Sequence, residues 1–260
     1  DNLLEGEVIV PVSALNRLRR KLVTLLDEAD TAKPKADVHE VIEDTSDKSQ
    51  RDLMPEMGEE IELTPELSVF TRYPEQIEAA LEAGVKRIYA DFEDIRRYKE
   101  AVSMVKESGT ESTIHLATPR IQKSGEAGYF KLIERAGADG VLIRNLGGLQ
   151  YFKDNKELYK TGDFSLNCAN PITAKILKER GGLDHLTVSY DLNIGQVKDM
   201  LYNSPEDWFE LTLHQHMPMF HMEHCVFCTF LSEGTSIKDC GKPCDNHKVQ
   251  LRDRVGQLHT

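Results

Sequence analysis

The chain has 260 residues and a mass of 29.5 kDa, with 40% hydrophobic residues and a formal net charge of −12. That apolar content can build a core, and no run approaches the roughly 20 apolar residues that a membrane-spanning helix needs. The negative charge argues against a bare surface for polyanions. The chain begins with Asp1, so we treat it as a processed or partial C-terminal piece of an intracellular protein, cytoplasmic or organellar.

Residues 1–29 contain a short candidate strand, Glu7–Val10, followed by a helix from Ser13 to about Glu28. The helix is amphipathic, and its basic residues indicate either a phosphate contact or a solvated face. One face carries the leucines at 15, 18, 22, 25 and 26, and the rest carries Arg17, Arg19, Arg20 and Lys21.

Residues 30–62 are rich in Asp, Glu, Lys, Thr and Ser and show little hydrophobic periodicity. Such a segment cannot bury enough apolar surface to offset the entropy of ordering its backbone. We therefore expect an acidic linker here, and a domain boundary, with rapid hydrogen exchange and preferential proteolysis.

From residue 63 to 217 the sequence alternates between short apolar runs and helical patterns. This alternation predicts parallel βα units, and seven such units favour a TIM-barrel-like fold over an open doubly wound sheet. An eighth strand is not obvious, so either Glu7–Val10 supplies it or the barrel is incomplete. The predicted strands are 67–71, 87–91, 113–117, 140–144, 162–166, 185–190 and 209–214, with helices at 74–83, 95–107, 124–136, 147–155, 171–180 and 193–203.

Polar residues recur where the predicted strands end, which is the edge that carries the chemistry in a βα barrel. We expect these residues to surround one substrate cavity. The candidates are Asp91, Arg120, Arg144, Asn167, Tyr190, His214 and His216.

Arg144 directly follows an apolar run, where a charge must be paired or face a cavity. Together with Arg120 it would clamp a carboxylate or phosphate, or else both would form salt bridges to Asp91 or Asp191. For Asn170, which precedes Pro171, capping of a helix is the preferred interpretation over ligand binding.

Two more features near the strand ends remain open. Cys168 stands apart from the other cysteines and is interpreted as a buried small side chain. His214 and His216 alternate along one predicted strand and so point to the same face. They would ligate a metal, transfer protons or form structural hydrogen bonds.

Residues 218–260 contain the other four cysteines in the pattern C-x2-C, eleven residues, then C-x3-C. This spacing indicates a soft-metal site, either an iron–sulfur cluster or Zn²⁺, and does not separate the two. A disulfide pair and simple burial are the alternatives, and His221 or His224 would replace a cysteine ligand if fewer than four bind. The predicted ligands are Cys225, Cys228, Cys240 and Cys244.

Several stretches resemble the collagenase-like peptidase family U32, in its long, RNA-hydroxylation-type members. They are HQHMPMFHMEHCVFC (214–228), DCGKPC (239–244), HKVQLRDRVGQLH (247–259), FSLNCANP (164–171), SYDLN (189–193) and VPVSALNRLRR (10–20). The last looks like the end of a domain that precedes this region in long members.

The resemblance implies a TIM-barrel-like fold with cysteines at the barrel rim, a [4Fe-4S] cluster, and hydroxylation of RNA bases with a small carboxylic acid such as prephenate as the oxygen source. It also implies an N-terminal catalytic half, in the same chain or a partner chain, that carries the family's main cysteine motif. The alternatives are a peptidase, the family's traditional label, and a non-catalytic scaffold stapled by metal. No HExxH or GxSxG motif supports a peptidase.

Overall fold

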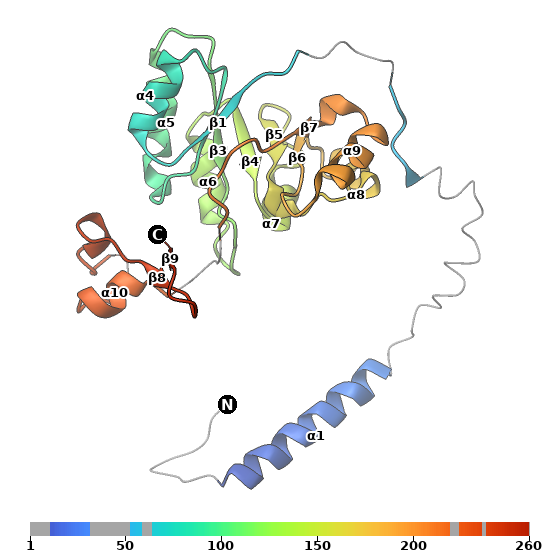
Figure 1. Cartoon of the computed structure of the whole chain (residues 1–260), viewed down its shortest axis with the longest axis vertical. Helices are drawn as coiled ribbons and strands as arrows, with labels where there is room; N and C mark the ends of the chain where they lie inside the picture. The colour runs from blue at the N-terminus through green and yellow to red at the C-terminus, as the bar shows by residue number, and fades with distance from the viewer. Residues whose placement is uncertain (1–10, 32–52, 59–63, 219–223, 236–237, 260) are drawn as a thin grey trace. The chain divides into compact units, whose positions relative to one another are not determined.

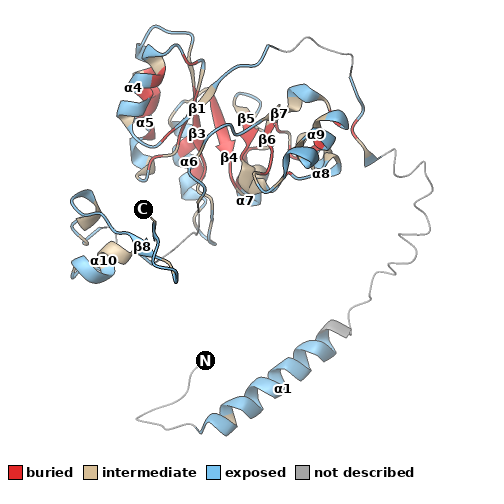
Figure 2. Ribbon diagram, in the orientation of Figure 1, coloured by how far each residue is buried: buried red, intermediate tan, exposed pale blue. Residues whose placement is uncertain are grey.

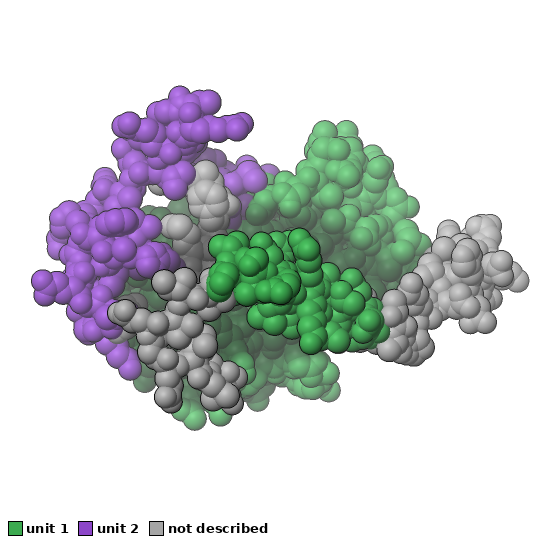
Figure 3. Space-filling view, turned by 90° about the horizontal axis from the view of Figure 1, so that it is seen from below, with its two compact units in different colours: residues 1–212 green, residues 213–260 purple. Residues whose placement is uncertain are grey.

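The computed structural model describes residues 11–31, 53–58, 64–218, 224–235 and 238–259. The chain forms two compact units, residues 1–212 and 213–260 (Figure 3). The expected strand at Glu7–Val10 and most of the expected linker lie outside the described residues.

Seven parallel strands form one sheet in the order in which they occur in the sequence (Figure 1). Each connection therefore advances by one strand, as in a βα barrel. The sheet is curled, because Glu210 of the last strand contacts Arg87 of the second, with 2.6 Å between Oε1 and Nη1. The fold is thus a TIM-barrel-like half-barrel, as predicted. The strands are β1 (Ser68–Thr71), β2 (Arg87–Ala90), β3 (Thr113–Ala117), β4 (Gly140–Ile143), β5 (Tyr159–Gly162), β6 (His185–Thr187) and β7 (Phe209–Glu210).

Three of the connecting helices begin directly after an asparagine: Asn145, Asn170 and Asn193. Each side chain accepts a hydrogen bond from the N–H three residues on, at 2.7, 2.8 and 3.1 Å respectively. Such a cap is worth about 1 kcal/mol, and the capping interpretation of Asn170 is confirmed. The helices between the strands are α4 (Pro74–Glu82), α5 (Tyr98–Glu107), α6 (Gly128–Arg135), α7 (Leu146–Phe152), α8 (Pro171–Glu179) and α9 (Ile194–Tyr202).

The main core lies between the sheet and these helices, and Figure 2 shows it in the buried strands. Alternate strand residues such as Ile88, Ile114, Leu116, Val141 and Ile143 are fully buried. Each contributes roughly 1.5–3 kcal/mol of hydrophobic free energy. The strand residues directly next to them in sequence point to the opposite, concave face.

Three predicted strands were wrong in extent. The sixth was placed at 185–190 and ends at Thr187. The fifth was placed at 162–166, but residues 164–166 form a 3₁₀ turn and the strand ends at Gly162. Asn167, with φ of 54°, closes that turn in a left-handed conformation that no strand contains. The seventh strand was placed at 209–214. It stops at Glu210, after its two residues have paired with β6.

Helix α1 (Val12–Thr31) has the amphipathic pattern that the sequence predicts. Its five leucines are between 50% and 67% exposed. An apolar stripe of this kind normally packs against another surface. The idea that α1 ends a preceding domain stays a prediction.

The second unit contains α10 (Val226–Leu231), a 3₁₀ turn at Pro243–Asp245, and an antiparallel hairpin of β8 (Leu251–Arg252) and β9 (Leu258–His259). The turn packs against α10. Throughout the described chain, no helix combines the length and the apolar character needed to cross a bilayer.

Candidate active site

The carboxyl ends of β1, β2 and β4 are joined by ion pairs around Asp91. Its Oδ2 lies 2.9 Å from Nη1 of Arg72 and 2.8 Å from Nη1 of Arg144. Arg144 also approaches Asp163, with 3.3 Å between Nε and Oδ2. Because the Arg144 side chain is only 7% exposed, losing both carboxylates would leave a buried, uncompensated charge. Of the two alternatives, Arg144 therefore takes the salt bridge to Asp91.

Asp163 and Ser165 were missed by the sequence reasoning, since both fall inside the misplaced fifth strand. Ser165 Oγ donates to Asp163 Oδ2 at 2.7 Å and contacts the Arg144 carbonyl oxygen at 2.8 Å. These bonds tie the loop after β5 to the end of β4. The sequence signal that could have found this site is Asp163, an acidic residue directly before the alternating apolar residues Phe164 and Leu166.

Arg120 behaves differently from the other two arginines at this edge. No carboxylate among the described residues lies within ion-pair distance of it, and its buried Nε has no hydrogen-bond partner. Its guanidinium carbon lies 5.1 Å from the centre of the Phe164 ring, and that ring lies 4.6 Å from the ring of Tyr190. The structure thus joins two predicted residues, Arg120 and Tyr190, through Phe164, which the sequence reasoning missed.

The remaining predicted residues are placed less centrally. The Asn167 side chain is exposed, and its left-handed backbone closes the turn that carries Phe164. His214 and His216 belong to the second unit, where their rings lie 6.2 Å apart and meet edge to face. The common cavity for all the candidates therefore stays a prediction, with Asp91–Arg144 and Arg120–Tyr190 as the pairs that are brought together.

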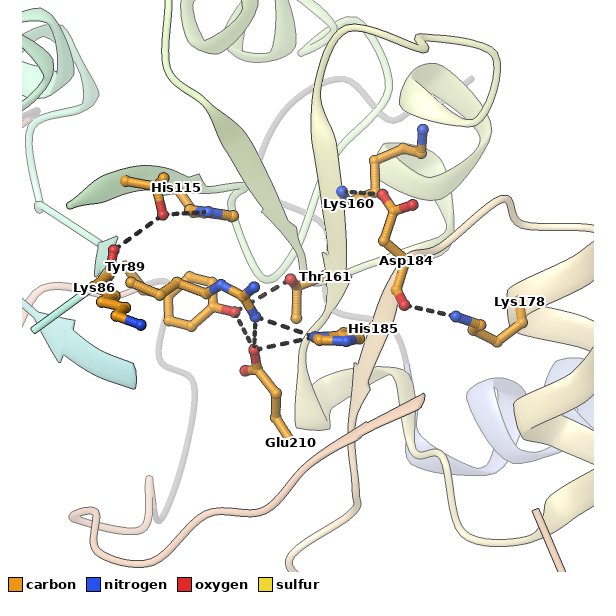
Figure 4. Close-up of polar contacts among 11 residues, drawn as sticks. Lys86, Tyr89, His115, Lys160, Thr161, Lys178, Asp184, His185 and Glu210 are labelled. Carbon is orange, nitrogen blue, oxygen red and sulfur yellow. Dashed lines mark hydrogen bonds and ion pairs between the residues drawn. The ribbon is translucent and has the colours of Figure 1, made fainter. Parts of the chain in front are cut away.

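A second polar cluster occupies the concave face deeper in the half-barrel, centred on Glu210 (Figure 4). Glu210 Oε1 accepts hydrogen bonds from Arg87 at 2.6 Å and from the Tyr89 hydroxyl at 2.7 Å. Burial alone would raise the pKa of Glu210, but hydrogen bonds from His185, Tyr89 and Arg87 and the charge of Arg87 outweigh it and lower the pKa. The carboxylate is therefore ionised and ties β7 to β2.

His115 of β3 lies in the same cluster and is 2% exposed. Its ring meets those of Tyr89 and Tyr159 edge to face at 5.3 and 5.6 Å, and a Cβ added at Gly140 would stand 2.2 Å from Nδ1. Burial, and next the charge of Arg87, lower its pKa to about 4. His115 is thus neutral at neutral pH and fills space beneath the rim.

The cysteine segment was tested for its fit to a metal or cluster. Cys225 Sγ accepts a hydrogen bond from the Cys228 N–H at 3.3 Å, and the pKa of Cys228 is raised by burial and then by the charges of Cys240 and Cys225. Among the described residues, however, no three His, Cys, Asp or Glu side chains are placed to hold a metal ion. The donor chemistry fits a soft metal, whereas the ligand geometry is not closed. His221 lies outside the described residues, and the His224 ring contacts Thr229 at 2.6 Å.

Cys168, by contrast, is fully buried, and burial raises the pKa of its thiol to about 12. Its interpretation as a buried small side chain is confirmed. It belongs to the main core.

Several solved structures are similar to this chain, and three of them, all at low identity, show the range. The U32 peptidase Mk0906 is 14% identical, with a TM-score of 0.45 over 59% of this chain and 71% of that one. MenC from Desulfotalea psychrophila LSv54 is 11% identical, with a TM-score of 0.38 over 57% and 46%. A putative mandelate racemase/muconate lactonizing enzyme from Sorangium cellulosum is 15% identical, with a TM-score of 0.40 over 62% and 49%. This chain thus spans about half the length of the last two.

No curated protein matches the chain. The model of peptidase family U32, in contrast, matches residues 74–254, which include the half-barrel from α4 onward and the cysteine segment. The match extends over more than half of the chain. The chain therefore belongs to peptidase family U32.

Proposed function

We propose that this chain is part of an iron–sulfur-dependent enzyme that hydroxylates RNA bases and takes a small carboxylic acid, such as prephenate, at the carboxyl ends of its strands. The observation that carries the proposal is Arg120, the rim arginine that no described carboxylate neutralises. A guanidinium presents paired donors that match a carboxylate or phosphate. The neighbouring Arg72 and Arg144 are already paired with Asp91.

The cysteine segment would supply the redox group. Hydroxylation replaces a C–H bond by C–OH and is a two-electron oxidation of the carbon, so it requires both an oxygen donor and a two-electron acceptor outside this chain. A [4Fe-4S] cluster held by Cys225, Cys228, Cys240 and Cys244 would pass these electrons one at a time to that acceptor when bound, and Zn²⁺ on the same ligands would be structural. An N-terminal half, in the same or a partner chain, would complete the enzyme.

Metal content tests the cofactor. We expect anaerobically purified protein to contain iron and labile sulfide, and Cys240→Ser and Cys244→Ser to lose both while the βα strands stay folded. Cys168→Ala is the matched control, because it removes a thiol from the core and should keep the iron. A colourless protein with one zinc per chain would contradict the cluster and favour a scaffold.

Mass spectrometry of RNA tests the reaction. A strain that lacks the protein should lose one hydroxylated base, and the wild-type gene should restore it, whereas the gene for Arg120→Gln should not. Arg97→Gln is the control, since Arg97 pairs with Glu100 on the exposed helix surface. Unchanged RNA together with accumulation of undigested peptides would instead favour the peptidase.

A further inference from the structure

We propose that Phe164 and Tyr190, with Arg120 beside them, form a platform on which a base of the RNA substrate stacks. This inference rests on the proposed function and identifies where the base binds. The two ring centroids are 4.6 Å apart, inclined at 55°, and the Arg120 guanidinium lies over the Phe164 ring at 5.1 Å.

Neither ring is needed to fill the core. Both are half-buried, and neither is part of the main hydrophobic cluster or of the partly buried side chains packed against it. Aromatic side chains that lie outside a core, at the strand ends where barrel enzymes bind substrate, are available to a ligand.

Hydrogen bonds hold the loops that carry the platform in place. Asn145 Nδ2 donates to the Pro119 carbonyl oxygen at 2.6 Å, which fixes the loop just before Arg120. Ser165 Oγ contacts the Arg144 carbonyl oxygen at 2.8 Å, which fixes the residue after Phe164. The loops of Arg120 and Phe164 are thus attached to the end of β4. The Ser189 N–H donates to the Cys168 carbonyl oxygen at 3.0 Å and fixes the residue before Tyr190, so the rings need little reordering to receive a ligand.

The chemistry of the three side chains matches a nucleotide. Every base offers a π face that stacks on an aromatic ring, and an adjacent arginine binds the phosphate or adds a cation–π contact. The buried Arg120 Nε, which has no hydrogen-bond partner among the residues that the structure describes, adds a donor at this position.

Binding of a single-stranded RNA oligonucleotide that contains 2-aminopurine tests the platform with the 260-residue chain. Stacking quenches the probe, and we expect Phe164→Leu and Tyr190→Leu to abolish the quenching and weaken affinity about 5- to 150-fold. Tyr190→Phe keeps the ring and should bind like wild type. Tyr202→Leu is the control, because Tyr202 is 75% exposed on α9. Arg120→Gln should reduce the slope of log affinity against log salt by about 0.7.

Equal binding and quenching in wild type, Phe164→Leu and Tyr190→Leu would overturn the platform, as would a wild-type chain that binds no RNA. So would variants that weaken the binding of a peptide and leave RNA binding unchanged. These outcomes are separate from the hydroxylation assay. Unchanged RNA in the strain that lacks the protein, together with quenching that depends on Phe164 and Tyr190, would refute the reaction and keep the platform. Tyr190→Phe against Tyr190→Leu gives the answer even if Phe164→Leu does not fold.

Discussion

The Glu210 cluster and the Arg120 platform both involve arginine beside aromatic rings, yet they differ in how charge is matched. In the Glu210 cluster, the Arg87 guanidinium lies 2.6 Å from the Glu210 carboxylate and 4.8 Å from the centre of the Tyr159 ring, so the protein itself supplies both partners. Around Arg120, the ring is present, and no carboxylate in the described part of the chain lies within ion-pair distance. A cluster that satisfies its own charges stabilises the fold, whereas a cation that lacks an anion at a strand end is suited to bind one.

Removing the charge of Glu210 should have the largest effect on stability. We expect Glu210→Gln to lower the free energy of unfolding by about 3 kcal/mol, at the low end for breaking a buried ion pair, because the amide still accepts one hydrogen bond. Urea denaturation monitored by Trp208 fluorescence measures the change. Glu100→Gln removes a carboxylate from an exposed pair and serves as control. A Glu210→Gln protein as stable as that control would show that the cluster does not stabilise the fold.

The pH dependence of stability tests the same cluster through His115. Its folded pKa of about 4 lies below the unfolded value of 6.5, so between these values the unfolded chain binds a proton that the folded chain refuses. The free energy of unfolding should therefore fall as the pH drops from 6.5 to 4, by up to about 3 kcal/mol. Denaturation at several pH values should show a flatter profile for His115→Phe. His247→Phe changes an exposed histidine and serves as control. A His115→Phe profile as steep as that of the wild type or of His247→Phe would contradict the prediction.

Arg120→Gln should have the smallest effect on stability and sharpen the comparison. We expect a loss of about 1 kcal/mol or less, because only a cation–π contact disappears. Binding of a small carboxylic acid, followed by isothermal calorimetry, should nevertheless be lost. Arg97→Gln should leave that binding unchanged. A large loss of stability with unchanged binding would make Arg120 a structural residue like Arg87.

Local patterns predicted the half-barrel well, because hydrophobic periodicity and helix caps depend on residues that are close together in the sequence. The Asn170 cap needed only the following proline and helical pattern. The Glu210 cluster could not be predicted in this way, since Glu210 and Arg87 are 123 positions apart and meet only once the sheet curls. Phe164 was missed for another reason. Its alternation with Leu166 has the period of a strand, and only the left-handed Asn167 shows that the chain turns there.

Gly140 lies so close to His115 that the side-chain volume tolerated at one position depends on the side chain at the other. Any side chain at 140 would displace the imidazole, since even a methyl group would stand 2.2 Å from Nδ1 and 2.6 Å from the Tyr159 carbonyl oxygen. Gly140→Ala should therefore disrupt the chain as it stands. Pairing it with a smaller residue at 115 would relieve the contact with the ring but not the contact with the backbone. The two sites can then vary together only where β5 itself shifts, which places a limit on how this part of the half-barrel can diverge in sequence.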